Sequence, residues 1–446
     1  MRRTPPRSTD PPAALPPHLS FVLGLSPSVM TLGLANMRGL LGRLGHPEKE
    51  FPAIVVAGTN GKGSVSAFVA AILQANGKRV GWYTSPHIFD VTERICVDGD
   101  PVTLGEMEEA AARIAPLHAE IGFSYFEALT AIAFQIFAAR KIDIAVLEVG
   151  LGGRFDATNV VDPVVSILTS VALDHRRILG DSVEEILREK LGIARPGVPL
   201  VCGRLSPGLR SIVEEKTGRD GIPLHPLERI GSAELVGMSF DGMRARLRTG
   251  AADYGEIRLP FMGESQLGNA LVSVRAAELV LGRVGRLAEA ARKVRLRGRF
   301  EVFRAGGKIL VFDVAHNDEA LIATFDTLVS LSPREDNAII LGVMRRKELR
   351  EAPAVLAARV RRAYLIEPVA AEAYTGPELF QTLGVRNLRD TGVDVVIEKF
   401  FAAEDEWAMF IERVLSAENP SRVILVTGSH RTVEAVGSRI PGVRIA

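Results

Sequence analysis

The segment Val55–Ala70, VVAGTNGKGSVSAFVA, decides the fold of this chain. An apolar run that is typical of a buried strand leads into a turn with three glycines, and a helical pattern of apolar residues follows. A strand, a glycine-rich turn and a helix N-terminus together present free backbone N–H groups and the positive end of a helix dipole, which bind polyphosphate. The segment departs from the usual G-x-x-x-x-G-K-[ST] pattern, because Val56 stands at the first glycine position and Gly63 follows Lys62.

This phosphate loop predicts an ATP site in which Lys62 supplies a positive charge for the β- and γ-phosphates. A plain strand–helix turn would not need three glycines around a lysine. A GTPase-type switch would need a guanine-reading N-K-x-D segment, and the sequence contains no Asn-Lys pair. The nucleotide-binding residues predicted in the loop are Thr59, Asn60, Gly61, Lys62, Gly63 and Ser64.

The composition is that of an ordinary globular enzyme, with 446 residues of which 47% are hydrophobic and 24% are charged. A formal net charge of +1 predicts no dedicated surface for nucleic acid or membrane. The two cysteines, Cys96 and Cys202, lack metal-type spacing, which favours a reducing cytoplasm without disulfides or a structural zinc. Only 10 residues are lysines, against 44 arginines, so each lysine is more informative than usual.

Apolar strand-like runs alternate with helical patterns along the chain, which predicts an α/β fold with mainly parallel sheets. The pattern breaks near ARKVRLRGRFEVF, and a second alternating series begins there. We therefore predict three parts. They are a proline-rich disordered leader (1–20), a P-loop-type ATPase domain (21–296) and a smaller C-terminal Rossmann-like α/β domain (297–446).

Polar residues end two apolar runs that we expect to be buried strands. Glu148 ends the strand in IDIAVLEVG, and Asp174 and His175 end PVVSILTSVALDH. Ligands of open α/β sheets bind at the carboxyl ends of the strands, and a buried carboxylate needs a partner. Glu148 and His175 beside the phosphate loop therefore predict a site for Mg²⁺, an ion that prefers oxygen ligands.

A further candidate residue is Lys190. The segment DSVEEILREKLGIARPG predicts a helix that opens with a capping box from Ser182 to Glu185 and stops at Pro196-Gly197. Lys190 falls on its apolar face, seven residues after Val183. Such a lysine either extends its ammonium to the surface or serves a site that lowers its pKa, and periodicity alone favours neither alternative.

Ten short motifs occur in the order typical of folylpolyglutamate synthases. They are VAGTNGKGS, TSPH, YFE, LEVGLGGRFDATN, LDH, EKLGIARPG, SQLGNA, RGRFEV, FDVAHN and VTGSH. The chain therefore resembles this family, and in particular its bacterial dihydrofolate synthase/folylpolyglutamate synthase branch within the Mur ligase superfamily. The resemblance runs from about Ser28 to the C-terminus, and GTNGKGS and GLGGRFDATN are its most specific motifs.

The resemblance implies roles for individual residues. Ser85 and Glu148 would hold a first Mg²⁺ and His175 a second, while Lys190 would be carbamylated and would act with Lys62 and His175 in catalysis. Further nucleotide contacts implied are Asn269, Arg299 and Asp313. The implied substrate-binding residues are Ser124, Tyr125, Phe126, Glu127, Phe155, Asp156, Ala157 and His316.

The implied activity is ATP-dependent addition of L-glutamate to dihydropteroate, to the γ-carboxylate of reduced folates, or to both. A carboxylate accepts no amine at neutral pH, because its leaving group is too poor, and phosphoryl transfer from ATP corrects this by making an acyl phosphate. A cell-wall Mur-type ligase and a non-catalytic nucleotide-binding module are the alternatives. The expected partners are small molecules, and the chain is expected to be a monomer.

Overall fold

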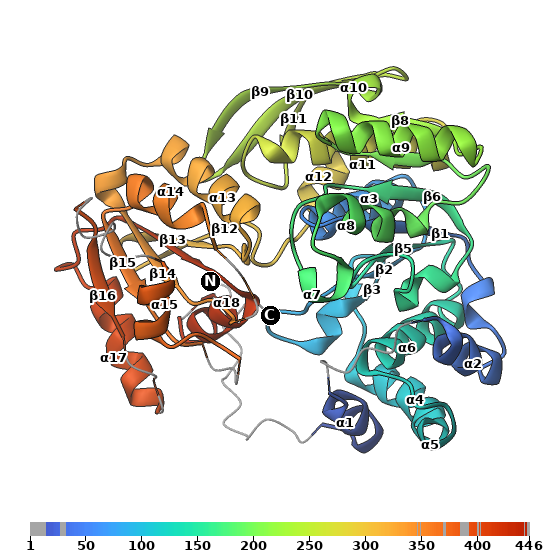
Figure 1. Ribbon diagram of the computed structural model, residues 1–446, viewed down its shortest axis with the longest axis horizontal. Coiled ribbons are helices and arrows are strands. Elements are labelled where there is room, and N and C mark those ends of the chain that lie inside the picture. Colours follow the sequence, from blue (N-terminus) through green and yellow to red (C-terminus); the bar gives the residue numbers. More distant parts are fainter. Residues whose placement is uncertain are drawn as a thin grey trace, which may run out of the picture.

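The computed structural model describes residues 15–26 and 33–443, apart from 346, 348, 369–371, 384–391, 399–400, 402 and 441. The strands of the described residues form sheets of eight, three and six strands. The eight-stranded and six-stranded sheets belong to two separate α/β parts, which we call the N-terminal and C-terminal domains (Figure 1). This arrangement confirms the predicted fold class, while the boundary near Arg297 stays a prediction.

The eight-stranded sheet carries the phosphate loop. Six neighbouring strands are parallel, and two antiparallel strands extend one edge. In spatial order the strands are β4 (Asp100–Pro101), β3 (Ile95–Val97), β2 (Val80–Tyr83), β5 (Ile144–Glu148), β1 (Ala53–Ala57), β6 (Pro163–Leu168), β7 (Leu200–Cys202) and β8 (Leu224–Pro226). The central position of β1 places the loop that follows it beside the ends of β5 and β6.

Side chains of β1 alternate between two hydrophobic cores, because successive residues of a strand point to opposite faces. Ile54 and Val56 pack in one core, and Val55 and Ala57 in the other. The first core includes α3 (Lys62–Ala75), α11 (Ser265–Leu281) and α12 (Leu287–Lys293). The second includes α1 (Pro17–Gly24), α2 (Ala35–Arg43), α4 (Leu104–Ile114) and α6 (Tyr125–Ala139).

The remaining helices of this domain are short or lie at the β7–β8 edge. They are α5 (His118–Ile121), α7 (Arg176–Leu179), α8 (Val183–Lys190), α9 (Pro207–Arg219) and α10 (Leu227–Ile230). Helix α1 begins inside the range predicted as a disordered leader, because Leu19 and Val22 are fully buried against the second core. Residues 1–14 of that leader lie outside the described residues.

An antiparallel three-stranded sheet, which the sequence analysis did not predict, covers part of the first core. Its strands are β9 (Gly231–Ser239), β10 (Gly242–Thr249) and β11 (Asp253–Leu259), with β10 in the middle. On β10, Ala245 and Leu247 are buried, whereas Arg244 and Arg246 are exposed. This alternation is typical of an antiparallel sheet with one face in the core and one in water.

The C-terminal domain is built around the six-stranded sheet. In spatial order its strands are β12 (Glu301–Ala305), β13 (Lys308–Phe312), β17 (Val423–Thr427), β14 (Asn337–Leu341), β15 (Arg362–Leu365) and β16 (Asp394–Ile397), and only the β12–β13 pair is antiparallel. Its helices are α13 (Asp318–Leu331), α14 (Ala352–Arg359), α15 (Gly376–Thr382), α17 (Glu404–Leu415) and α18 (His430–Gly437). None of the helices in the described part of the chain has the length and hydropathy that a membrane span requires.

Candidate active site

The phosphate loop joins β1 to α3, and two of its glycines are required by their surroundings. A Cβ on Gly58 would lie 1.9 Å from Thr169 Oγ1, which no side chain can tolerate. Gly61 has a φ of +84° at the start of α3, and a Cβ there would lie 2.9 Å from Asn269 Nδ2. The loop is therefore packed between the chain after β6 and helix α11, which brings Asn269 beside it.

The segment after β6 holds the phosphate loop in shape without a ligand. Thr59 N donates to Ser170 O at 2.8 Å, and Asn60 N donates to Ser170 Oγ at 3.0 Å. Thr169 Oγ1 donates to Asn60 O at 2.6 Å. These bonds fix two N–H groups and one carbonyl of the loop and leave its backbone conformation pre-organised for phosphate, so little ordering is needed on binding.

Lys62 lies inside the loop. Its Nζ donates to Gly58 O at 3.0 Å and to Thr59 O at 3.1 Å. Burial lowers the pKa of the ammonium, while the nearby carboxylates of Glu148 and Asp174 act in the opposite direction. The ammonium is thus held by two loop carbonyls, and a bound phosphate would be a stronger hydrogen-bond acceptor for it than either carbonyl.

Ser64, two residues after the lysine, has a buried hydroxyl that makes no hydrogen bond to the described residues. Its side chain is fully inside the fold at 1% exposure. An unpaired buried hydroxyl is unfavourable, and in a native structure it points to a missing partner. A phosphate oxygen at the N-terminus of α3 would supply that partner, which supports the predicted placement of the nucleotide.

Glu148 and Ser85 meet at the ends of β5 and β2, which are neighbours in the sheet. Glu148 Oε2 accepts from Thr84 Oγ1 and, at 3.3 Å, from Ser85 N. A Cβ on Gly63 would lie 3.6 Å from Glu148 Oε2 and 3.4 Å from Arg299 Nη2. The structure therefore brings Ser85, Glu148 and the C-terminal domain's Arg299 to the start of α3.

These oxygen donors fit a magnesium ion. No group of three or more His, Cys, Asp or Glu side chains among the described residues forms a protein-only metal site. Mg²⁺ is usually bound through one or two carboxylates together with water and substrate phosphates, so a full protein cage is not expected. The buried carboxylate of Glu148, the Ser85 hydroxyl and the unpaired Ser64 hydroxyl are donors of the right chemistry beside the phosphate loop.

His175 does not end a strand, and that prediction was wrong. β6 stops at Leu168, and His175 lies seven residues further on, with a φ of +50°, where α7 begins. Its Nε2 lies 3.4 Å from Lys347 Nζ. Burial and the Lys347 charge lower the pKa of His175 to about 3, so the ring is the neutral imidazole that can bind a metal.

The structure decides between the two alternatives for Lys190. Helix α8 has the predicted capping box, and it ends at Lys190 itself instead of at Pro196. The side chain is 4% exposed, and its Nζ donates to Gly58 O at 2.8 Å. Burial, and then the charge of Lys62, lower the pKa of Lys190 to about 7. The lysine therefore points at the phosphate loop and does not reach the surface.

The residues predicted for the substrate pocket divide into two groups. The loop that follows β5, residues 149–156, is called the glycine-rich loop here. Phe126 packs against it, because a Cβ on Gly150 would lie 2.6 Å from the Phe126 ring. Phe155 is 45% exposed. The carboxylates of Glu127 and Asp156 are used locally: Glu127 closes a capping box with Ser124, and Asp156 accepts from the N–H groups of Leu151 and Thr158.

Ala157 is also buried, and Tyr125 lies under Arg94, whose guanidinium is 5.7 Å from the ring centroid. Phe126 thus packs on the glycine-rich loop and Asp156 fixes the backbone of that loop, whereas Glu127 caps helix α6. Gly153 of the same loop packs on the last turn of α8, where a Cβ would lie 2.7 Å from Lys190 O. The loop is therefore tied to the helix that carries Lys190.

Asp313 and His316 follow β13 in the C-terminal domain. The carboxylate of Asp313 accepts from Phe300 N and from Ala315 N, each at 2.8 Å, which holds the turn that carries Arg299. Burial raises the pKa of this carboxyl group. His316 Nε2 lies 3.4 Å from Asp174 Oδ2, so this predicted substrate residue is brought to the N-terminal domain.

Sequence analysis missed Asn317, Glu319 and Lys347 as members of the site. Asn317 stood in the FDVAHN motif but was assigned no role. Asn60 Nδ2 donates to Glu319 Oε2 at 2.5 Å, and Asn317 Nδ2 donates to Asn60 Oδ1 at 3.1 Å. Lys347 carried one usable signal, the scarcity of lysine in the chain.

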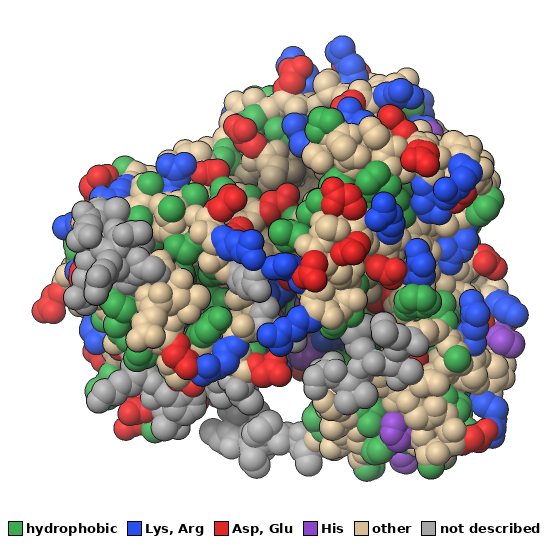
Figure 2. All heavy atoms as spheres, in the orientation of Figure 1, with side chains coloured by type: hydrophobic (Ala, Val, Ile, Leu, Met, Phe, Trp, Pro, Cys, Tyr) green, Lys and Arg blue, Asp and Glu red, His purple; other side chains and the backbone are tan. Residues whose placement is uncertain are grey.

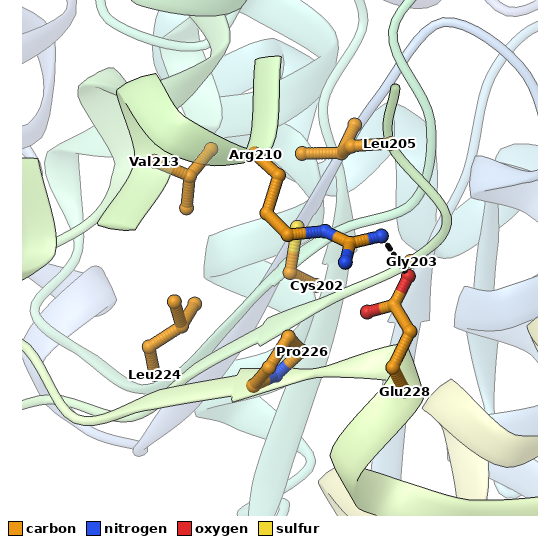
Figure 3. A pocket seen from close by; sticks show the side chains of 8 residues that line it. All are labelled: Cys202, Gly203, Leu205, Arg210, Val213, Leu224, Pro226 and Glu228. Atoms are coloured by element: carbon orange, nitrogen blue, oxygen red, sulfur yellow. Dashed lines mark hydrogen bonds and ion pairs between the residues drawn. The ribbon is translucent and has the colours of Figure 1, made fainter. Parts of the chain in front are cut away.

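A separate small pocket lies away from these residues. It is lined by Cys202, Gly203, Leu205, Arg210, Val213, Leu224, Pro226 and Glu228 (Figure 3). The ion pair between Arg210 and Glu228 crosses its mouth, and burial raises the pKa of the Cys202 thiol to about 12. A protonated thiol and a satisfied ion pair offer no reactive group, so this pocket is not a second catalytic site.

Comparisons with known proteins agree with this geometry. Residues 298–430 match the sequence model of the family described as "Mur ligase, glutamate ligase domain". The chain is 30% identical over 424 residues to the dihydrofolate synthase/folylpolyglutamate synthase of Bacillus subtilis, covering 92% of this chain and 95% of that protein. It is also 30% identical over 386 residues to the Escherichia coli protein of the same name, covering 86% and 88%.

Solved structures give the same result. Folylpolyglutamate synthase of Mycobacterium tuberculosis, complexed with ADP and AMPPCP, superposes with a TM-score of 0.80 at 27% identity, covering 91% of this chain and 95% of that one. E. coli FolC in complex with DHPP and ADP gives a TM-score of 0.80 at 28% identity, covering 97% and 98%.

A phosphate loop that faces a second α/β domain across a shared set of polar residues defines an ATP-dependent ligase of the Mur type. The 30% sequence identity to two dihydrofolate synthase/folylpolyglutamate synthases, which extends over 92% and 86% of this chain, identifies the family within this class. The chain belongs to the dihydrofolate synthase/folylpolyglutamate synthase family, whose members are ATP-dependent glutamate ligases.

Proposed function

We propose that this chain adds L-glutamate to dihydropteroate, to the γ-carboxylate of reduced folates, or to both. The observation that carries the proposal is the convergence of Lys62, Lys190 and Glu148 on one phosphate loop, with Arg299 reaching it from the other domain. A non-catalytic nucleotide-binding module would have no need of this set. The chain acts on small molecules, and we propose that it does so as a cytoplasmic monomer.

In the proposed reaction, the loop N–H groups and Lys62 hold the γ-phosphate while the acceptor carboxylate attacks it. This step breaks the bond between the γ-phosphorus and the β–γ bridging oxygen, releases ADP and leaves an acyl phosphate. The glutamate amine then attacks the acyl carbon, loses a proton and displaces inorganic phosphate, which leaves the amide. Lys62 is drawn from Gly58 O and Thr59 O to the transferring group, where it offsets the charge of two anions. Arg299 adds a second positive charge from the C-terminal side, beside Gly63.

We propose that Glu148 and Ser85 hold one Mg²⁺ and that His175 holds a second. Bound there, magnesium would screen the negative charges of the nucleotide and the acceptor carboxylate. The chain's own part is to hold the donors in place. Thr84 Oγ1 and Ser85 N donate to the Glu148 carboxylate and orient it, and His175 Nε2 lies 3.8 Å from Asp174 Oδ1.

Replacement of these proposed ligands should change the magnesium requirement. We expect Glu148→Gln and His175→Ala each to raise the Mg²⁺ concentration for half-maximal activity about tenfold or more, because each removes a metal donor. Titration of Mg²⁺ in a phosphate-release assay measures this. Glu189→Gln, which changes a half-buried carboxylate paired with Arg154, is the control. An unchanged Mg²⁺ dependence in both test variants would mean that the two residues are structural.

The acceptor is identified by supplying purified protein with ATP, radiolabelled glutamate and either dihydropteroate or tetrahydrofolate. Product formation with dihydropteroate alone would define a dihydrofolate synthase, and product formation with both would define a bifunctional enzyme. We expect at least one of the two acceptors to incorporate glutamate. Failure of both, in protein that binds ATP and is folded, would overturn the proposed function.

A further inference from the structure

Asp174 is a point of contact between the two domains. It belongs to the N-terminal domain, but three side chains of the C-terminal domain surround its carboxylate. Lys347 Nζ lies 2.6 Å from Oδ1, and Asn317 Nδ2 donates to Oδ2 at 3.3 Å. His316 Nε2 lies 3.4 Å from the same Oδ2. In Figure 2, charged side chains of both signs gather where the two domains meet.

The Asp174–Lys347 ion pair is almost completely removed from water. The side chain of Asp174 is 10% exposed and that of Lys347 is 8% exposed. Loss of one partner of such a pair leaves an uncompensated buried charge, which is strongly unfavourable. The two groups therefore favour the docked arrangement of the domains as long as both are present and paired.

Asp174 is also close in sequence to the residues that brace the phosphate loop. Thr169 and Ser170 hold the backbone of the loop, and Ala172 N donates to Thr59 Oγ1 at 3.1 Å. Only one residue, Leu173, separates Ala172 from Asp174 in the chain. A change in the position of the Asp174 carboxylate therefore shifts the short segment 169–174, and this segment is hydrogen-bonded to the loop that holds the nucleotide.

A second link reinforces the first. Asn60 of the phosphate loop is hydrogen-bonded to Asn317 and Glu319 at the start of α13. The side-chain amide of Asn317 also donates to Asp174. Helix α13 therefore contacts both the loop and the segment that braces it. Burial raises the pKa of the Glu319 carboxyl group, which agrees with its position inside this junction.

We propose that Asp174 is a positioning residue, and that its pairing with Lys347 couples docking of the C-terminal domain to the shape of the phosphate loop. Lys347 acts by anchoring Asp174, so that the loop after β6 and the phosphate loop reach their working arrangement when the domains are together. This inference rests on the proposed function only for its kinetic readout, since domain docking can be measured without turnover.

The test compares two lysines of the C-terminal domain. Lys347→Met removes the charge across the domain junction and keeps a long buried side chain, and Lys347→Arg restores the charge. Lys308→Met is the matched control, because the buried Lys308 ammonium donates to Asn419 O and Ser421 O inside its own domain. The measurements are kcat, the KM for glutamate, the Kd for ADP, the melting temperature and the radius of gyration from small-angle X-ray scattering with ADP bound.

We expect Lys347→Met to lower kcat about 30-fold or more, since a buried charge pair is broken. The Kd for ADP should rise severalfold as well, because the phosphate loop is expected to lose its working arrangement when the domains separate. The radius of gyration should increase, and Lys347→Arg should recover a large part of kcat. Lys308→Met should lower the melting temperature without an increase in the radius of gyration.

A double variant separates coupling from general damage. If the two groups act as a pair, Asp174→Asn with Lys347→Met should be no slower than Asp174→Asn alone. Multiplied losses, a near-normal kcat in Lys347→Met, or an unchanged radius of gyration would each overturn the proposal. If the wild-type chain ligates glutamate to neither acceptor, the proposed function fails, while the scattering comparison still decides whether the pair holds the domains together.

Discussion

Lys62→Ala should reduce ATP-dependent glutamate incorporation by a factor on the order of 10³, which is the effect of removing one charge stabiliser from a phosphoryl-transfer site. Within the part of the chain that the structure describes, the Nζ of Lys62 donates to Gly58 O and Thr59 O, which are both carbonyls of the loop. Its removal therefore deprives the phosphates of a charge without opening the hydrophobic core. The melting temperature should change little, since burial already disfavours this ammonium.

Incorporation of radiolabelled glutamate, measured beside a thermal melt, tests this expectation. Lys78→Ala is the matched control, because Lys78 is exposed just after the end of α3 and faces no phosphate. Lys62→Arg is a second informative variant, since it keeps the charge but replaces a compact ammonium with a planar group. Near-normal turnover in folded Lys62→Ala protein would contradict the assignment of this loop to the nucleotide.

Much of the fold could be predicted because the continuous apolar runs of the sequence coincide with strands that are buried in the structure. The apolar runs at β1 and β5 are long enough to be recognised as buried strands, and the alternating series after residue 297 indicates the second sheet. The three-stranded sheet was missed although β10 has a clear alternation. Its signal has a period of two and includes three arginines, which is weaker than a continuous apolar run.

The placement of His175 failed for a related reason. The run PVVSILTSVALDH is apolar throughout, and a sequence pattern cannot tell where a strand stops and an extended loop begins. The structure ends β6 at Leu168 because Thr169 and Ser170 turn their polar groups to the phosphate loop. His175 still reaches the site, through the length of this loop and a left-handed residue instead of through a strand end.

Two of the site residues that sequence analysis proposed share one property, which is that a local pattern conflicts with their chemistry. Lys190 is a charge on an apolar helix face, and Glu148 is a charge at the end of a buried strand. The pairing of Asp174 with Lys347 spans 173 residues and two domains. No local pattern encodes such a contact, because each residue alone is compatible with an exposed surface.

Lys190→Ala should be nearly inactive, with glutamate incorporation lowered by about 10³-fold. The ammonium of Lys190 and that of Lys62 both lie on Gly58 O, at 2.8 Å and 3.0 Å. Burial, and after it the repulsion between two like charges on one carbonyl, lower the pKa of Lys190 to about 7. A substantial fraction of the side chain is then a neutral amine near neutral pH, which is the form that reacts with CO₂.

We expect Lys190 to be carbamylated in the active enzyme. The amine nitrogen forms a bond to the carbon of CO₂ and releases a proton, which leaves a carbamate that keeps one N–H for Gly58 O. The new negative charge lies beside Lys62 and thereby replaces a repulsive pair with an attractive one. Protein prepared with ¹³C-labelled bicarbonate should show a carbamate signal by NMR, and the signal should be absent from Lys190→Ala.

Rescue experiments distinguish a lost acid from a lost lysine. Small carboxylic acids such as acetate should partly restore activity to Lys190→Ala, because the shortened side chain leaves room for a carboxylate beside the loop. They should not restore Lys190→Met, whose side chain fills that room with methylene groups and a thioether. The idea fails if Lys190→Ala is fully active, or if the active wild-type enzyme gives no carbamate signal. The contrast between the two variants matters most, since only a requirement for a negative group at this point predicts that the smaller side chain is the one that can be rescued.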